Sequence, residues 1–168
     1  MGGRAKGLLR TSEGARVIDR TLALARRISR NVALVGASGA YDVEVPRIED
    51  TRAGAGPLGG LSALLEHAGE ASAIALACDM PLITYDLLGR LASYGGAAAA
   101  LAPRRDGRWE SLFSRFDSPR ALPVVRARLA RGSLSLQGLF EELAADELPL
   151  SPSEARLLSD WDRPEDLP

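Results

Sequence analysis

Residues 73–82 read Ala-Ile-Ala-Leu-Ala-Cys-Asp-Met-Pro-Leu, and the rest of the sequence is best interpreted from this stretch. Its first six residues are uncharged and none of them breaks a strand, a pattern typical of a strand buried on both faces in a parallel sheet. Pro81 lacks a backbone N–H and disfavours helical backbone at Met80, so we expect the strand to end there. Asp79 then lies at the carboxyl end of a central strand, where open α/β sheets bind their ligands.

A carboxylate at the position of Asp79 needs a partner, because burying an unpaired charge is costly. A Mg²⁺ ion, bound through one or two carboxylates together with substrate phosphates, would supply the opposite charge. A pairing with arginine or a role as a helix cap would satisfy the same carboxylate. Both interpretations stay open at this point.

The composition indicates a single domain spanning residues 1–168, because 168 residues with 46% hydrophobic content can bury a sizeable core. A formal net charge of −1 argues against a nucleic-acid partner and against a basic membrane-binding patch. Cys78 is the single cysteine, which excludes an intramolecular disulfide and favours a buried thiol in a reducing, cytoplasmic compartment. We find no apolar run of about 20 residues that could span a membrane, and no secretory signal.

Strand-like and helix-like segments alternate along the chain, which predicts a three-layer α/β/α sandwich around a mostly parallel, Rossmann-like sheet. Besides the strand above, we expect strands at 31–36, 97–102, 109–116, 148–150 and 156–158, a short edge segment at 43–48, and helices at 14–30, 61–68, 85–94, 121–130, 134–144 and from 162 onward. Thr84 is a predicted N-cap, and Asp106-Gly107 is a predicted hairpin turn. Four glycines and a proline make residues 53–60 a predicted loop.

Two glycine-rich stretches are candidate phosphate or nucleotide sites. Residues 1–9, Met-Gly-Gly-Arg-Ala-Lys-Gly-Leu-Leu, combine glycines whose backbone N–H groups can approach phosphate with the mobile charge of Lys6. A solvated terminus would have the same composition. The stretch 54–60 could close against a nucleobase or a phosphate, or be rich in glycine for geometric reasons alone. Asp50, which precedes it, could accept a hydrogen bond from a base or begin a turn.

A second pair of carboxylates, Asp160 and Asp162, stands at alternate positions near the end of the chain. In an extended segment both would point the same way, and together with Asp79 they could hold a metal ion. Ordinary helix-start chemistry explains Asp162 equally well, because it precedes Arg-Pro-Glu as an N-cap does. His67 is the single histidine and is expected to be exposed late in a helix, so a catalytic triad or a zinc site has no support.

Four motifs occur in a specific order over essentially the whole chain. They are Met-Gly-Gly-x-x-Lys-Gly-Leu-Leu at 1–9, Ile-Glu-Asp at 48–50 followed by Gly-Pro-Leu-Gly-Gly at 56–60, Ala-Cys-Asp-Met-Pro at 77–81, and Asp-x-Asp-x-Pro-Glu-Asp-Leu at 160–167. In this order and spacing the chain resembles the molybdenum cofactor guanylyltransferase family of nucleotidyltransferases.

The resemblance implies a nucleotide-diphospho-sugar transferase type of fold and the transfer of GMP from GTP to molybdopterin-bound molybdenum cofactor, with release of pyrophosphate. It implies two catalytic residues, Lys6 and Asp79. The implied GTP-binding residues are Lys6, Gly36, Asp50, Gly56, Gly59 and Asp79, and the implied Mg²⁺ ligands are Asp79, Asp160 and Asp162.

The partners that follow from the resemblance are GTP, the molybdenum cofactor, and other cofactor-biosynthesis proteins or a molybdoenzyme chaperone. Three arginines, Arg104, Arg105 and Arg108, are candidates for contacting the anionic phosphate of the pterin, although solvated surface charge is the favoured interpretation for any one of them.

The chain also departs from the family pattern. The family opens with a strand and a Leu-Ala-Gly-Gly-x-Ser-x-Arg loop ahead of Met-Gly-Gly, and residues 1–168 do not contain them. Gly36 stands where some members have asparagine, and Asp160-x-Asp162 stands where the family has Asn-x-Asn. We therefore expect an upstream segment whose strand fills the middle of the sheet. The alternatives are another nucleotidyltransferase of the same fold, or an inactive nucleotide-binding homologue.

Overall fold

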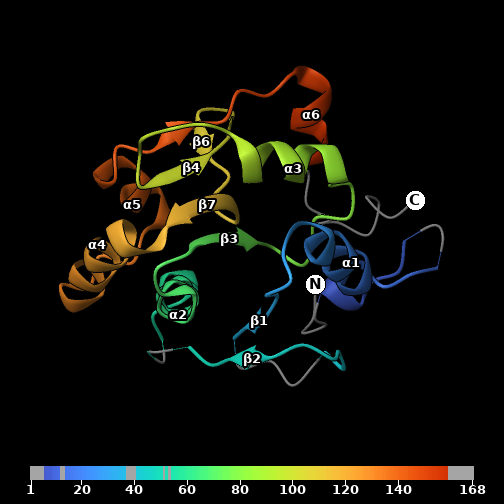
Figure 1. Cartoon of the computed structure of the whole chain (residues 1–168), viewed down its shortest axis with the longest axis horizontal. Coiled ribbons are helices and arrows are strands. Elements are labelled where there is room, and N and C mark those ends of the chain that lie inside the picture. Colours follow the sequence, from blue (N-terminus) through green and yellow to red (C-terminus); the bar gives the residue numbers. More distant parts are fainter. Residues whose placement is uncertain (1–5, 12–13, 37–40, 51, 53, 159–168) are drawn as a thin grey trace.

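The computed structural model describes residues 6–11, 14–36, 41–50, 52 and 54–158 of the chain. Its helical elements are η1 (Lys6–Leu8), α1 (Val17–Ile28), α2 (Pro57–Ala68), α3 (Tyr85–Ser93), α4 (Ser118–Ala130), α5 (Leu136–Glu142) and α6 (Pro152–Leu157) (Figure 1). Its strands are β1 (Leu34–Val35), β2 (Arg47–Ile48), β3 (Ser72–Leu76), β4 (Ala100–Ala102), β5 (Arg104–Arg105), β6 (Arg108–Trp109), β7 (Phe113–Asp117) and β8 (Asp146–Glu147).

The central sheet has the strand order β3-β7-β4-β8. β7 pairs antiparallel with both β3 and β4, and β4 pairs parallel with β8, so β3, β4 and β8 run in one direction and β7 opposes them. β1 and β2 form a separate parallel ladder below this sheet in Figure 1. The predicted α/β class is confirmed, and the sheet is mixed because β7 is inserted between β3 and β4. The expected additional strand stays a prediction.

Side chains alternate between two helical layers along β3 and β4 of the central sheet. Ala73 and Ala75 of β3 pack with α2, α4 and α5, whereas Ile74 and Leu76 pack with α3 and its neighbours. β4 repeats the pattern, with Leu101 on the α3 side. Because successive residues of a strand point to opposite faces, this partition makes the predicted three-layer sandwich.

Small strand residues allow the α2 and α4 layer to pack closely against the sheet. The alanines of β3 and β4 leave room for large side chains from the helices, among them Leu58 and Leu65 of α2. Phe140 of α5 is fully buried and stacks on Trp109, with ring centroids 5.3 Å apart, while its distance to the Phe116 ring is 5.5 Å. These aromatic contacts join α5, the β5–β6 hairpin and β7 into one core.

Several local predictions are confirmed. Thr84 caps α3, because its hydroxyl accepts a hydrogen bond from the Leu87 N–H at 3.3 Å. The turn between β5 and β6 places Asp106 at φ 51° and Gly107 at φ 76°, which is the left-handed pair that a two-residue hairpin requires. His67 is exposed on α2, as expected. Within the described residues, no helix combines the length and the apolar character needed to cross a membrane.

The predicted loop at 53–60 is wrong in its second half. Pro57 begins α2, because its fixed φ and missing N–H suit the first helical position. The two glycines that follow belong to this helix and meet close neighbours: a Cβ on Gly59 would lie 3.2 Å from the Arg52 carbonyl oxygen, and one on Gly60 would lie 3.1 Å from Asp50 Oδ1. Both positions therefore need glycine because residues 50 and 52, outside the helix, leave no room for a side chain.

The predicted strands at 148–150 and 156–158 are also wrong. β8 lies earlier, at Asp146–Glu147, and α6 occupies the second segment. α6 begins with a capping box, in which the Ser151 hydroxyl accepts from the Glu154 N–H and the Glu154 carboxylate accepts from the Ser151 N–H. The two hydrogen bonds of the capping box favour a helix here over the strand predicted from the short apolar run. The predicted helix from 162 lies outside the described residues.

Three predicted strands are shorter than expected. The segment 109–116 divides into β6 and β7, because a turn closes between them with Phe113 N–H donating to the Glu110 carbonyl at 2.9 Å. β3 ends at Leu76, four residues before Met80, and one further hydrogen bond joins Ala77 N–H to the Leu112 carbonyl at 2.8 Å. Of residues 31–36, the strand β1 covers Leu34–Val35.

The aromatic core generates a stability prediction. Phe140→Ala should lower the free energy of unfolding by about 3–5 kcal/mol, because it removes a buried ring and leaves a cavity between Trp109 and Phe116. Leu134→Ala is the matched control, since this leucine is 40% exposed and its truncation should change stability by about 0.5 kcal/mol or less. Urea denaturation followed by circular dichroism measures both, and equal losses in the two variants would contradict the assignment.

Candidate functional site

Asp79 lies in the turn that follows β3, at the carboxyl end of this strand. Its side chain is half-buried. The turn is fixed on both sides, because the Ala77 N–H donates a hydrogen bond to the Leu112 carbonyl and Met80 is buried in the α3 layer, with 4% of its surface exposed. The predicted central strand is wrong: β3 is an edge strand of the described sheet, paired antiparallel with β7, and it ends at Leu76, so Asp79 lies three residues beyond it. A carboxylate held at the rim of a sheet, partly out of water, can bind a cation more strongly than one in bulk solvent.

A buried tyrosine connects this turn to the N-terminal part of the chain. Tyr41 is 8% exposed, and its hydroxyl accepts a hydrogen bond from the Gly7 N–H at 3.3 Å and lies 3.3 Å from Cys78 Sγ. Burial raises the pKa of Tyr41 to about 12, so its phenol is protonated at neutral pH. η1, which contains Lys6 and Gly7, is thus held against the residue that precedes Asp79.

Cys78 was expected in the core, and the structure shows it half-buried beside Tyr41 instead. Tyr41 itself carries no sequence signal. The two partners of its hydroxyl are 34 and 37 residues away along the chain, and no motif or periodicity joins segments that distant.

The second group of predicted residues surrounds the N-terminus of α2. Gly36 follows β1, has a φ of 108°, and donates its N–H to the Ile48 carbonyl at 2.9 Å. Asp50 is exposed and follows β2, and its carboxylate lies beside Gly60 in the first turns of α2. Gly56 is the N-cap of α2, with a φ of 58° and no side chain to cap the helix. Uncapped N–H groups at a helix start are suited to binding anions and polar ring edges.

The structure thus arranges the predicted residues in two groups. One contains Asp79 with the η1 backbone, and the other contains Gly36, Asp50, Gly56 and Gly59 at the start of α2. α2 packs against β1, β2 and β3, so it lies between the ladders that carry the two groups. The side chain of Lys6 and the whole of Asp160 and Asp162 lie outside what the structure describes, and their predicted roles stay predictions.

Two of the three candidate arginines have structural partners. Arg104 lies over the Trp109 ring, 4.0 Å from its centroid, and pairs with Glu141 at 3.2 Å. Arg105 pairs with Glu110 at 2.6 Å. Arg108 is exposed at the start of β6. The hairpin itself follows the carboxyl end of β4, which runs in the same direction as β3.

The family model described as MobA-like NTP transferase domain matches residues 1–147 of this chain. The chain belongs to this family. A molybdenum cofactor guanylyltransferase of Pseudomonas putida is 34% identical over 174 residues, which cover 99% of this chain and 88% of that protein. As a MobA-like NTP transferase, the chain is a nucleotidyltransferase of molybdenum cofactor biosynthesis.

Solved structures show the same fold. The molybdopterin-guanine dinucleotide biosynthesis protein A of Archaeoglobus fulgidus has a TM-score of 0.74 at 19% identity, covering 96% of this chain and 86% of that one. The 2-C-methyl-D-erythritol 4-phosphate cytidylyltransferase of Thermus thermophilus has a TM-score of 0.72 at 15% identity, covering 96% and 89%. MobA-like NTP transferases therefore share their architecture with an enzyme named for cytidylyl transfer, and the fold alone does not select the base.

The contact between Asp50 and α2 generates a prediction about glycine. Gly89→Ala in α3 should raise the free energy of unfolding by about 0.5–1 kcal/mol, because a Cβ there meets no atom within 4 Å and alanine favours a helix. Gly60→Ala should give no such gain, since its Cβ must displace Asp50 Oδ1 at 3.1 Å and Val35 Cγ1 at 3.3 Å. Urea denaturation compares the two, and an equal gain at both positions would show that Asp50 is not held beside α2.

Proposed function

We propose that this nucleotidyltransferase transfers GMP from GTP to molybdopterin-bound molybdenum cofactor and releases pyrophosphate. The observation that carries the proposal is a half-buried aspartate in the turn after strand β3, in a chain 34% identical to a protein named molybdenum cofactor guanylyltransferase. Asp79 occupies the place where an α/β sheet binds a phosphorylated ligand.

The reaction needs alignment more than acid–base chemistry. A phosphate oxygen of the acceptor forms a bond to the α-phosphorus of GTP, and the bond from that phosphorus to the bridging oxygen of the β-phosphate breaks. Pyrophosphate leaves with the electron pair. The attacking oxygen is already ionised at neutral pH, so no general base is required. The work of the protein is to position two anions and to offset their charge.

Asp79 fits a Mg²⁺ ion, because a carboxylate oxygen is the donor that this ion takes together with nucleotide phosphates. We assign Asp79 as the principal ligand, with Asp160 or Asp162 assisting. When bound, Mg²⁺ would neutralise charge on the α- and β-phosphates. Lys6 has the complementary role of offsetting charge on the triphosphate.

The start of α2 is the proposed guanine site. Guanine presents N–H donors at N1 and at its 2-amino group, and a carboxylate such as Asp50 can accept from both. Adenine and cytosine do not present this pair of donors. Asp50 is exposed and held beside Gly60, so it is accessible to a base that lies against the exposed Gly56 at the start of α2, where no side chain blocks a flat ring.

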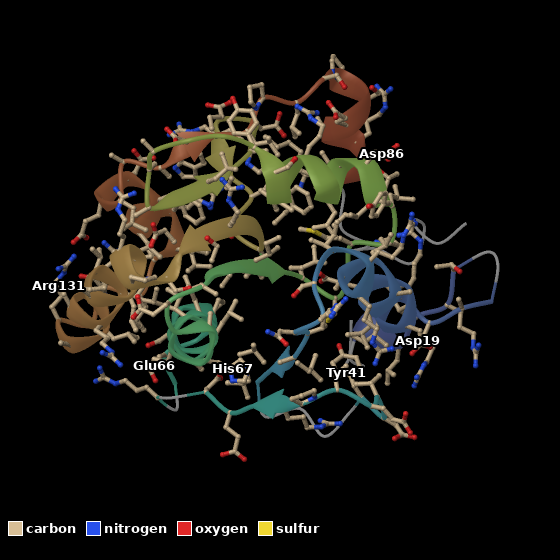
Figure 2. The ribbon with its side chains drawn as sticks, in the orientation of Figure 1. Asp19, Tyr41, Glu66, His67, Asp86 and Arg131 are labelled. Atoms are coloured by element: carbon tan, nitrogen blue, oxygen red, sulfur yellow. The ribbon has the colours of Figure 1, made fainter. Side chains whose placement is uncertain are left out.

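The metal assignment predicts the effect of removing one charge. Asp79→Asn should abolish GMP transfer while the denaturation midpoint stays close to that of the wild type, because the site loses charge but keeps its shape. Asp86→Asn is the matched control: this exposed carboxylate lies at the start of α3, well away from Tyr41 in Figure 2. Transfer is measured as pyrophosphate release with molybdopterin-bound molybdenum as acceptor. Full activity in Asp79→Asn would refute the assignment.

The base assignment predicts a preference for GTP over ATP and CTP of roughly tenfold to a hundredfold, since an unmatched polar contact to a carboxylate covered by the bound base costs about 1–3 kcal/mol. Competition binding against labelled GTP measures it, and Asp50→Asn should reduce the preference. ATP or CTP binding as tightly as GTP would exclude the guanine site and favour another nucleotidyltransferase. Tight GTP binding without any transfer would favour a binding module.

A further inference from the structure

Tyr41 joins the two segments that contain the proposed catalytic residues. Its hydroxyl oxygen accepts from the Gly7 N–H and lies within bonding distance of Cys78 Sγ, each at 3.3 Å. Gly7 follows Lys6 in sequence, and Cys78 precedes Asp79. A single hydroxyl therefore connects the backbone next to Lys6 with the residue next to Asp79.

The ring of Tyr41 also packs directly on Gly7. A Cβ placed on Gly7 would lie 2.8 Å from Cε1, 3.0 Å from Oη and 3.1 Å from Cζ of the tyrosine. No side chain fits in that space, so the glycine is required here for close approach. η1 is consequently fixed by a ring face and by a hydrogen bond at the same residue.

Tyr41 is itself firmly held from the other side. It packs in a cluster with Ile18 and Leu22 of α1, and its carbonyl accepts a hydrogen bond from the Arg47 guanidinium. Figure 2 shows Tyr41 between α1 and the strands β1 and β2. A buried side chain anchored in this way can fix the segments that it touches, whereas an exposed one would move with them.

We propose that Tyr41 is a positioning residue, which sets the backbone separation of Lys6 and Asp79 by bonding Gly7 and Cys78 through one hydroxyl. This role rests on the proposed function, because it matters for catalysis only if Lys6 and Asp79 act on the same triphosphate. A shift of about 1 Å in such a pair can reduce the rate by roughly a hundredfold. Tyr41→Phe keeps the ring and removes the hydroxyl, so it isolates the hydrogen bonds.

The test begins with the hydrogen bond itself. Amide hydrogen exchange followed by NMR should show the Gly7 N–H protected in the wild type and exchanging at least several-fold faster in Tyr41→Phe. Tyr85→Phe is the matched control. Tyr85 is the first residue of α3, is 38% exposed, and packs under Arg27 of α1 rather than on η1. Equal Gly7 exchange in the wild type and Tyr41→Phe overturns the proposal, whether or not the protein transfers GMP.

The second measurement separates positioning from general destabilisation. In Tyr41→Phe we expect kcat to fall by roughly tenfold to a hundredfold while KM for GTP changes by less than about threefold, since alignment is lost and binding groups remain. Tyr85→Phe should change neither. An unchanged kcat together with faster Gly7 exchange also overturns the proposal. A wild-type chain without transfer activity refutes the proposed function instead, and the exchange rates then decide alone whether Tyr41 holds η1.

Discussion

The register between β3 and β7 is the constraint on which the rest of the structure depends. The ladder runs from Ser72 opposite Asp117 to Leu76 opposite Phe113, and it sends alternate side chains into two different helical layers. A slip by one residue would exchange the two sets, placing Ile74 where the α2 layer leaves room for alanine. The same register determines where the ladder stops, and hence where the chain turns and presents Asp79.

Glycines at the candidate site serve two different physical purposes. Gly36 and Gly56 have φ values of 108° and 58°, so they supply backbone conformations that other residues adopt only with strain. Gly7 and Gly60 instead allow a neighbour to approach, namely the Tyr41 ring and the Asp50 carboxylate. The first pair shapes the turns, and the second pair brings separate segments into contact.

Features that depend on residues close together in the sequence are predicted correctly. The Thr84 cap, the Asp106-Gly107 hairpin and the layered α/β class all follow from local chemistry and periodicity. The predicted loop at 53–60 treats Pro57 as a breaker together with the four glycines, whereas its fixed geometry begins a helix. Ser151 and Glu154 have the spacing of a capping box, and the helix that they begin forms in place of the predicted strand at 156–158.

In the candidate site, too, local features could be predicted and long-range contacts could not. The turn that presents Asp79 after a strand follows from its own stretch, whereas the role of Tyr41 could not be found from sequence, because both contacts of its hydroxyl are made across more than 30 residues of chain. Long-range packing of this kind is determined by the assembled core and leaves no periodic trace.

The strand order has a consequence for folding during synthesis. β3 pairs with β7, although β4 is made earlier and lies on the far side of β7. Until residues 113–117 have emerged from the ribosome, β7 cannot pair with β3 and β4. The edges of β3 and β4 that face β7 then have no ladder partner among the described strands. The chain must close the loop from Leu76 to Phe113 before the pairing stabilises it, which slows folding and prolongs the exposure of unpaired strand edges. The core of the domain is therefore completed only after most of the chain has been made.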